Sequence, residues 1–81
     1  MASGLTIYST TWCGYCTRLK NQLTRAGVAF DEVDIEAEPE AEALVRAANG
    51  GNATVPTLVF ADGRTLTNPP LPVVLEAVAA A

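Results

Sequence analysis

The chain has 81 residues, a net charge of −4 and no histidine, and its five lysines and arginines form no cluster. This composition argues against nucleic acid and anionic membrane surfaces as partners, because both are bound through basic patches. Without histidine, Ser-His-Asp triads, Cys-His nucleophile pairs and histidine metal sites are excluded. Two cysteines cannot complete a four-ligand zinc site within one chain unless carboxylates or a second chain contribute, and we expect no bound metal.

The N-terminal segment and the length of the chain bear on location and organisation. MASGLTIYST, residues 1–10, has neither the basic start nor the apolar run of a signal peptide. No stretch approaches the roughly 20 apolar residues of a membrane span. We therefore expect one domain with a thin core over residues 1–81, cytoplasmic and monomeric.

The first half of the chain predicts a β-α-β unit. Leu5–Ser9 is rich in β-branched and aromatic residues and predicts a buried strand. Val28–Ile35 alternates apolar and acidic residues and predicts a second strand, parallel to the first through a right-handed crossover. Between them, a helix that starts at Cys13 and stops at Gly27 is predicted by apolar positions at three- and four-residue spacing: Cys16, Leu19, Leu23 and Ala26.

The second half predicts a helix, a hairpin and a final helix. Pro39 suits a first helical turn, and Pro56 lacks the N–H that a ladder requires, so it belongs at the start or edge of a strand. The expected elements are a helix from Pro39 to the Asn-Gly-Gly run at 49–51, a strand over Thr57–Phe60, a turn at Ala61–Arg64, a short strand at Thr65–Leu66 and a helix over Leu71–Ala80.

The two cysteines of the chain, Cys13 and Cys16, lie where the first strand passes into the first helix. Residues three apart on a helix have β-carbons about 5–6 Å apart, close to the separation that a disulfide bridges. Cys13 falls at the first turn, where unpaired N–H groups and the helix dipole favour a negative charge, so we expect it to attack first. Cys16 lies further in and is expected to resolve a disulfide formed on Cys13.

A static disulfide or a pair of buried thiols is the alternative for these cysteines. Cytosolic disulfides are seldom structural, and a bridge closing so small a loop would constrain the unfolded chain little. A C-x-x-C beside a βαβ pattern is instead typical of thiol-disulfide chemistry. We therefore predict that Cys13 and Cys16 form a redox-active pair.

Two motifs, WCGYC at Trp12–Cys16 and TVPT at Thr54–Thr57, together resemble the glutaredoxin branch of the thioredoxin fold over nearly the whole chain. The resemblance implies an α/β three-layer sandwich, with a small mixed four-stranded sheet flanked by three helices. In that family a cis-proline lies beside the active site, and the preceding residue offers its backbone to the thiol-containing part of the substrate. Pro56 and Val55 match those positions, so the resemblance implies a substrate-binding role for Thr54, Val55 and Pro56.

The segment ADGRTLTNPP, Ala61–Pro70, departs from the Gly-Gly pair and acidic residues usual in relatives that use glutathione. With WCGYC and GGNxTVPT it is most similar to the mycoredoxins, which reduce mixed disulfides between proteins and mycothiol, the low-molecular-weight thiol of actinobacteria. The resemblance implies mycothiol as co-substrate and no bound cofactor, with mixed-disulfide proteins and mycothiol reductase as partners. It also implies that Thr67 and Asn68 lie near the bound thiol, and ordinary turn residues are the alternative.

The aromatic residues Trp12 and Tyr15 flank Cys13 and are expected to form an apolar rim for the substrate. Partial core packing is the alternative for Trp12, whereas Tyr15 is the stronger surface candidate. Arg18 and Lys20 are expected to be solvated helix residues, although a positive charge near Cys13 would help to hold a thiolate or a substrate carboxylate.

Three other functions fit parts of the sequence. A redoxin that carries electrons from thioredoxin reductase to ribonucleotide reductase would share the fold. An iron-sulfur carrier would use Cys13 of two chains and two external thiols, which Gly14 in place of the commoner proline leaves open. A catalytically silent binding module would require an unreactive Cys13.

Overall fold

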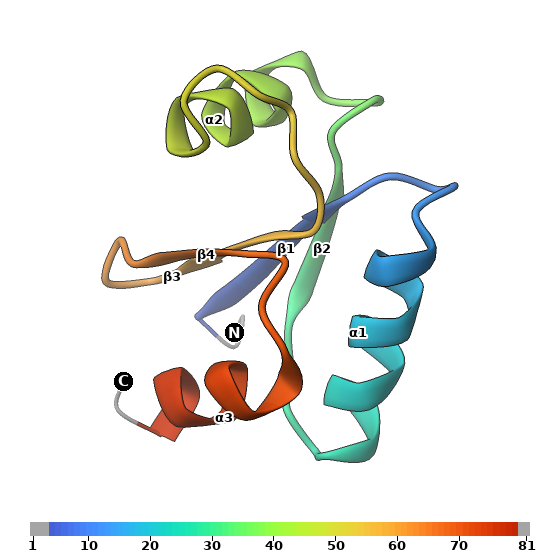
Figure 1. The fold of residues 1–81 in the computed structure, drawn as a ribbon, viewed down its shortest axis with the longest axis vertical. Helices are drawn as coiled ribbons and strands as arrows, with labels where there is room; N and C mark the ends of the chain where they lie inside the picture. The colour runs from blue at the N-terminus through green and yellow to red at the C-terminus, as the bar shows by residue number, and fades with distance from the viewer. Residues whose placement is uncertain (1–3, 80–81) are drawn as a thin grey trace.

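A computed structural model of the chain describes residues 4–79, which form one sheet covered by helices (Figure 1). The strands lie in the order β2-β1-β3-β4, with β1 and β2 parallel and the other neighbours antiparallel. The predicted mixed four-stranded sheet flanked by three helices is therefore confirmed. Along the chain the elements are β1 (Leu5–Ser9), α1 (Gly14–Arg25), β2 (Asp31–Asp34), α2 (Pro39–Ala48), β3 (Thr57–Phe60), β4 (Thr65–Thr67) and α3 (Leu71–Ala79).

The two faces of the sheet are covered by different helices, α1 and α3 on one face and α2 on the other (Figure 1). Successive side chains of a strand point to opposite faces, so each face has its own apolar cluster. The cluster under α2 joins Ile35, Ala41 and Val45 to half-buried neighbours that include Tyr8 and Val55. The larger cluster, under α1 and α3, consists of Leu5, Ile7, Leu19, Leu23, Leu58, Phe60 and Val74.

The first helix ends in a Schellman motif built on Gly27. Gly27 has a φ of 76° and its N–H donates to the Thr24 carbonyl, while the Val28 N–H donates to the Leu23 carbonyl. The predicted stop at Gly27 is thus confirmed. Ala26, expected on the apolar face, is exposed because it is the residue that caps the helix.

The second strand is shorter than the predicted Val28–Ile35, by three residues at its N-terminal end and by one at its C-terminal end. β2 begins at Asp31 and pairs with β1 over Asp31–Asp34. Val28 cannot join this ladder because its N–H is used in the helix cap, and Phe30 packs instead against the larger cluster. The short strand after the hairpin reaches Thr67, one residue further than expected.

Helix α2 begins at Pro39, and β3 covers Thr57–Phe60, as predicted. Helix α3 runs to Ala79, and the predicted final residue, Ala80, lies outside the described residues. None of the helices in the described part of the chain has the length and apolar character needed to span a bilayer.

Candidate active site

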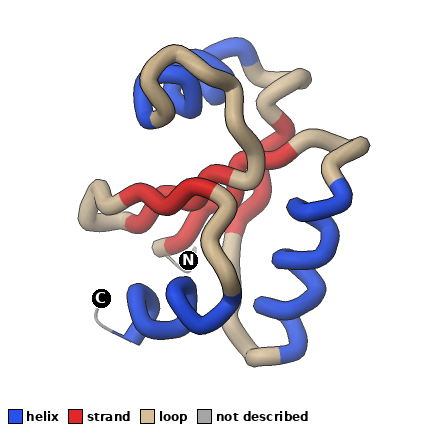
Figure 2. Tube along the Cα trace, viewed as in Figure 1, coloured by secondary structure: helices blue, strands red, loops and turns tan. Residues whose placement is uncertain are grey.

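Two loops meet at the carboxyl end of β1 (Figure 2). One carries the chain from β1 into α1 and contains Trp12 and Cys13, and the other leads from α2 to β3 and contains Val55 and Pro56. The Cys13 sulfur lies 4.0 Å from the Val55 carbonyl oxygen, at the outer limit of a hydrogen bond donated by a thiol. The fold therefore brings the WCGYC and TVPT motifs into contact.

Cys13 is the N-cap residue of α1, with an extended backbone at φ −81° and ψ 109°. Its sulfur accepts a hydrogen bond of 3.1 Å from the Cys16 N–H, in the place where a serine or aspartate oxygen usually caps a helix. An anionic sulfur at this position would keep that hydrogen bond and interact favourably with the partial positive charge of the helix N-terminus. Cys13 is 5% exposed, so little of this residue meets solvent.

Cys16 lies one turn further into α1 and is fully buried. Burial raises the pKa of the Cys16 thiol to about 12, and the neighbouring Cys13 thiol adds to the rise, against smaller opposing effects of the Thr10 backbone and Lys20. Both cysteines are free thiols in the structure. At neutral pH the environment thus disfavours a Cys16 thiolate.

The Val55–Pro56 peptide bond is cis, as predicted. The Pro56 carbonyl accepts a hydrogen bond of 2.8 Å from the Asn68 N–H, which joins the second motif to the segment after β4. Asn68 has a φ of 45°, a left-handed conformation that asparagine tolerates better than most residues. Within residues 4–79 the Val55 N–H has no acceptor.

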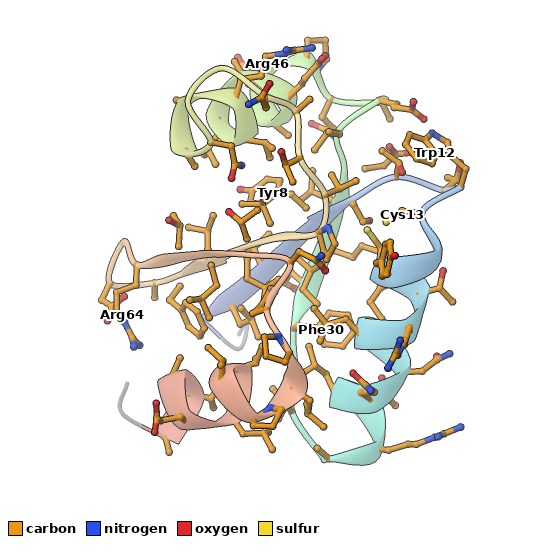
Figure 3. The ribbon with its side chains drawn as sticks, in the orientation of Figure 1. Tyr8, Trp12, Cys13, Phe30, Arg46 and Arg64 are labelled. Atoms are coloured by element: carbon orange, nitrogen blue, oxygen red, sulfur yellow. The ribbon has the colours of Figure 1, made fainter. Side chains whose placement is uncertain are left out.

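The two aromatic residues beside Cys13 are on the surface. Trp12 is 70% exposed and Tyr15 is 66% exposed, which contradicts the alternative of core packing for Trp12. The Trp12 indole Nε1–H donates to Glu36 Oε2 at 3.0 Å, and its ring lies at the edge of the molecule beyond Cys13 (Figure 3). Both rings are therefore accessible to a partner that approaches Cys13.

A hydrogen-bond network behind the second motif was not predicted. The buried Thr57 hydroxyl donates to the Thr54 carbonyl at 2.7 Å and accepts from the Asn49 amide at 3.1 Å. The same amide group donates to the Val45 carbonyl, and its oxygen accepts from the Thr67 hydroxyl. Asn49, the C-cap residue of α2, therefore holds the Thr67 side chain and also fixes the loop that carries Val55. In the sequence Asn49 indicated only the end of a helix.

Lys20 is also more constrained than predicted. Its ammonium group forms an ion pair with Glu32, and Glu32 Oε2 accepts a hydrogen bond of 2.8 Å from the buried Ser9 hydroxyl. The hydrogen bond from Lys20, followed by the one from Ser9, lowers the pKa of Glu32. Residues 4–79 bring together no group of three or more cysteine, aspartate or glutamate side chains that could hold a metal ion.

Comparison with known proteins identifies the family of this chain. The model of the glutaredoxin family matches residues 5–65. The chain belongs to the glutaredoxin family. A candidate glutaredoxin of Mycobacterium tuberculosis is 59% identical to it over 69 residues, which cover 85% of this chain and 82% of that protein. Mycoredoxin 1 of Corynebacterium glutamicum is 42% identical over 67 residues, covering 83% and 82%.

The fold agrees with solved members of the family. The solution structure of the glutaredoxin from Brucella melitensis is 28% identical and superposes with a TM-score of 0.71, covering 94% of this chain and 82% of that one. The sequence is thus mycoredoxin-like within a glutaredoxin fold. As a glutaredoxin with a C-x-x-C pair, the protein is a thiol-disulfide oxidoreductase.

Proposed function

We propose that this glutaredoxin reduces mixed disulfides between proteins and mycothiol, using Cys13 as the nucleophile. The observation that carries the proposal is the position of the Cys13 sulfur, which caps α1 and lies against the cis Val55–Pro56 loop. The similarity to Mycoredoxin 1 supports mycothiol as the thiol. The protein would act in the cytoplasm, as a monomer and without a bound cofactor, with mycothiol and its reductase completing the cycle.

The reaction begins when the Cys13 thiolate attacks the mycothiol sulfur of the mixed disulfide. A bond forms between Cys13 and mycothiol, the original disulfide breaks, and the substrate protein leaves as a thiolate that takes up a proton. A second mycothiol then attacks the mycothiol sulfur held on Cys13. This step releases the mycothiol disulfide, regenerates Cys13 and transfers the oxidation to a small molecule that the reductase can reduce.

The second step favours an external thiol over Cys16. Attack by Cys16 on the Cys13 sulfur requires a thiolate at a fully buried position, where burial raises the pKa to about 12. A thiol that is free in solution is not buried, so its pKa is not raised in this way. The backbone N–H of Cys16 caps the Cys13 sulfur whatever its side chain. The Cys16 thiol, although disfavoured as a thiolate, is the neighbouring group that can resolve Cys13 when a protein disulfide leaves a bulky adduct.

The backbone of Val55 is suited to hold the substrate. Its N–H lacks an acceptor within residues 4–79, and its carbonyl has only the Cys13 thiol as a donor there. An extended cysteine derivative could exchange hydrogen bonds with both groups and present its sulfur to Cys13. Asn68, joined to Pro56, borders the same position.

The test is a turnover assay on one protein carrying a mixed disulfide with mycothiol and, separately, with glutathione. Each substrate is supplied with its own thiol and the matching reductase. The proposal predicts faster turnover of the mycothiol adduct. Equal or faster turnover with glutathione would contradict mycothiol as the thiol. Efficient direct reduction by thioredoxin reductase without any small thiol would favour the redoxin that serves ribonucleotide reductase.

A further inference from the structure

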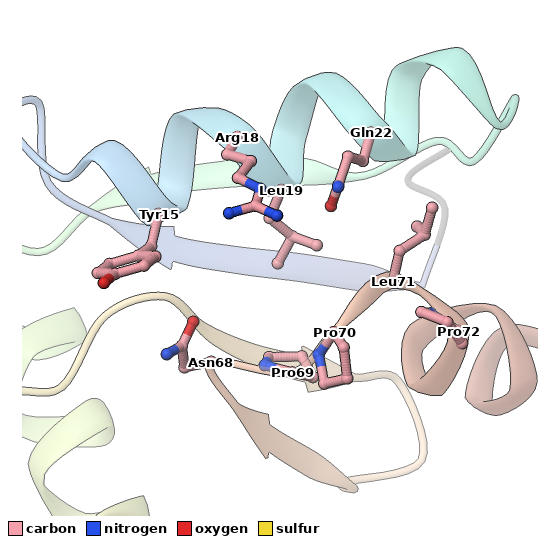
Figure 4. A pocket seen from close by; sticks show the side chains of 9 residues that line it. All are labelled: Tyr15, Arg18, Leu19, Gln22, Asn68, Pro69, Pro70, Leu71 and Pro72. Carbon is pink, nitrogen blue, oxygen red and sulfur yellow. The ribbon is translucent and has the colours of Figure 1, made fainter.

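A groove with a volume of about 360 Å³ begins beside the active site at Tyr15 and runs between α1 and the segment that enters α3 (Figure 4). The α1 side contributes Arg18 and Gln22. The opposite side contributes Asn68 and the proline-rich stretch 69–72. The groove therefore starts at Tyr15, one of the two residues between the cysteines, and extends away from them along α1.

The charge of the groove comes from Arg18. Within residues 4–79, Lys20, Arg46 and Arg64 each have a carboxylate partner, whereas Arg18 and Arg25 have none. Arg46 and Arg64 lie on other parts of the surface, away from Cys13 (Figure 3). The guanidinium group of Arg18 points from α1 toward the opposite wall of the groove (Figure 4). In a chain with a net charge of −4, an unpaired cation thus faces the space beside the nucleophile.

The opposite wall is mainly apolar. Its prolines have no N–H group, and the Pro70 carbonyl already accepts from the Val73 and Val74 N–H groups at the start of α3. Hydrogen-bond donors are therefore concentrated on the α1 side and at Asn68. Such a groove complements a segment that carries an apolar group on one side and a carboxylate on the other.

The length of the groove suits a short stretch of polypeptide. From Tyr15 to Gln22 the axis of α1 advances about 10 Å, at roughly 1.5 Å per residue. An extended chain covers that length with about three residues, at roughly 3.3 Å each. A carboxylate that reaches Arg18 would therefore lie within about three residues of the substrate cysteine, whose sulfur is bonded to the mycothiol sulfur that Cys13 attacks.

We propose that this groove binds the polypeptide segment that flanks the modified cysteine of the substrate, and that Arg18 selects for an acidic side chain in that segment. The inference rests on the proposed function, since it requires a polypeptide on one side of the mixed disulfide. It adds a preference among substrate proteins that does not depend on the identity of the small thiol.

The test uses peptides whose single cysteine forms a mixed disulfide with mycothiol. One peptide has glutamate two residues before the cysteine and another has it two residues after. Each is paired with a peptide in which glutamine replaces the glutamate. Wild type should turn over the better glutamate peptide with a kcat/KM about two- to fivefold above its glutamine counterpart, the range that an exposed ion pair supports. Arg18→Gln should remove this difference. Arg25→Gln is the matched control, because it removes the other unpaired cation of α1 and should retain the preference.

A binding measurement separates this inference from the proposed function. The glutamate peptide with serine in place of cysteine should shift the amide resonances of Arg18, Leu19 and Gln22 in the wild type, and do so more weakly in Arg18→Gln. Shifts confined to other surfaces would overturn the inference, as would equal turnover of the glutamate and glutamine peptides. If mycothiol alone shifts the same resonances and displaces the peptide, the groove belongs to the small thiol and the inference is also wrong. Failure of turnover with every peptide, with the binding intact, would contradict the proposed function alone.

Discussion

Replacement of Thr57 by valine tests whether the hydrogen bonds behind the second motif stabilise the protein. Thr57 is fully buried, and its hydroxyl donates to the Thr54 carbonyl at 2.7 Å and accepts from Asn49 at 3.1 Å. Valine has nearly the same shape, so the substitution leaves no cavity. The Asn49 amide keeps its bond to Val45, but the Thr54 carbonyl loses the partner that Thr57 supplies.

The expected loss follows from these contacts. A typical net hydrogen bond contributes about 0.5–1.5 kcal/mol, and a buried group left unsatisfied adds about 1–3 kcal/mol. Because Thr54 is only half-buried, we expect Thr57→Val to lower the free energy of unfolding by about 2–3 kcal/mol. For a domain of this size, a change of 1 kcal/mol shifts the Tm by about 4–8 °C, so the Tm should fall by roughly 10–20 °C.

The assay is urea and thermal unfolding of the reduced protein, followed by circular dichroism, with Thr57→Ser as the matched control. Serine keeps the hydroxyl and removes one methyl group, which costs about 1 kcal/mol. A loss below 1 kcal/mol for Thr57→Val, or an equal loss for both variants, would show that the Thr57 hydroxyl does not stabilise the loop.

Three further predictions concern titration and reactivity. Because the pKa of Cys16 rises from its ordinary value of 9.0 to about 12 on folding, the folded state holds this proton more tightly, and the associated stability is present below pH 9 and is lost as the pH rises toward 12. Urea unfolding of the reduced protein at increasing pH should show this loss, and a Cys16→Ala variant that shows the same pH dependence would contradict it. The pKa of Glu32 is lowered by Lys20 and Ser9, so its contribution is present above the ordinary value of 4.5 and is lost as the pH falls through the lower folded value. Lys20→Met should raise the pKa of Glu32 in a carboxyl NMR titration, and an unchanged pKa would show that Lys20 is not the main cause. Alkylation of the reduced protein at mildly acidic pH should label Cys13 first by mass spectrometry, and preferential labelling of Cys16 would reverse the roles of the two thiols.

Much of the fold follows from local sequence signals. The spacing of Leu19 and Leu23 determines the buried face of α1, and Gly27 adopts the left-handed conformation that ends it. The motifs WCGYC and TVPT also predicted a cis bond at Pro56 and contact with Cys13. These features depend on residues close together in the chain or on a pair of motifs typical of one family.

The features that the sequence did not predict depend on contacts between distant segments. Asn49 reaches Thr67 across 18 positions, and Lys20 reaches Glu32 across 12. An asparagine before Gly-Gly and a lysine on a helix have ordinary local roles, so neither indicates such a partner. The late start of β2 has a similar cause, because the cap of α1 uses the Val28 N–H before the chain reaches the sheet.

The one-cysteine cycle at Cys13 is tested most directly by comparing two serine variants on a protein–mycothiol mixed disulfide, in the presence of mycothiol and its reductase. We expect Cys13→Ser to be inactive, because it lacks the nucleophile. Cys16→Ser should keep substantial turnover, because free mycothiol resolves the adduct on Cys13. A loss in Cys16→Ser as deep as that in Cys13→Ser would contradict the one-cysteine cycle and favour the redoxin linked to ribonucleotide reductase.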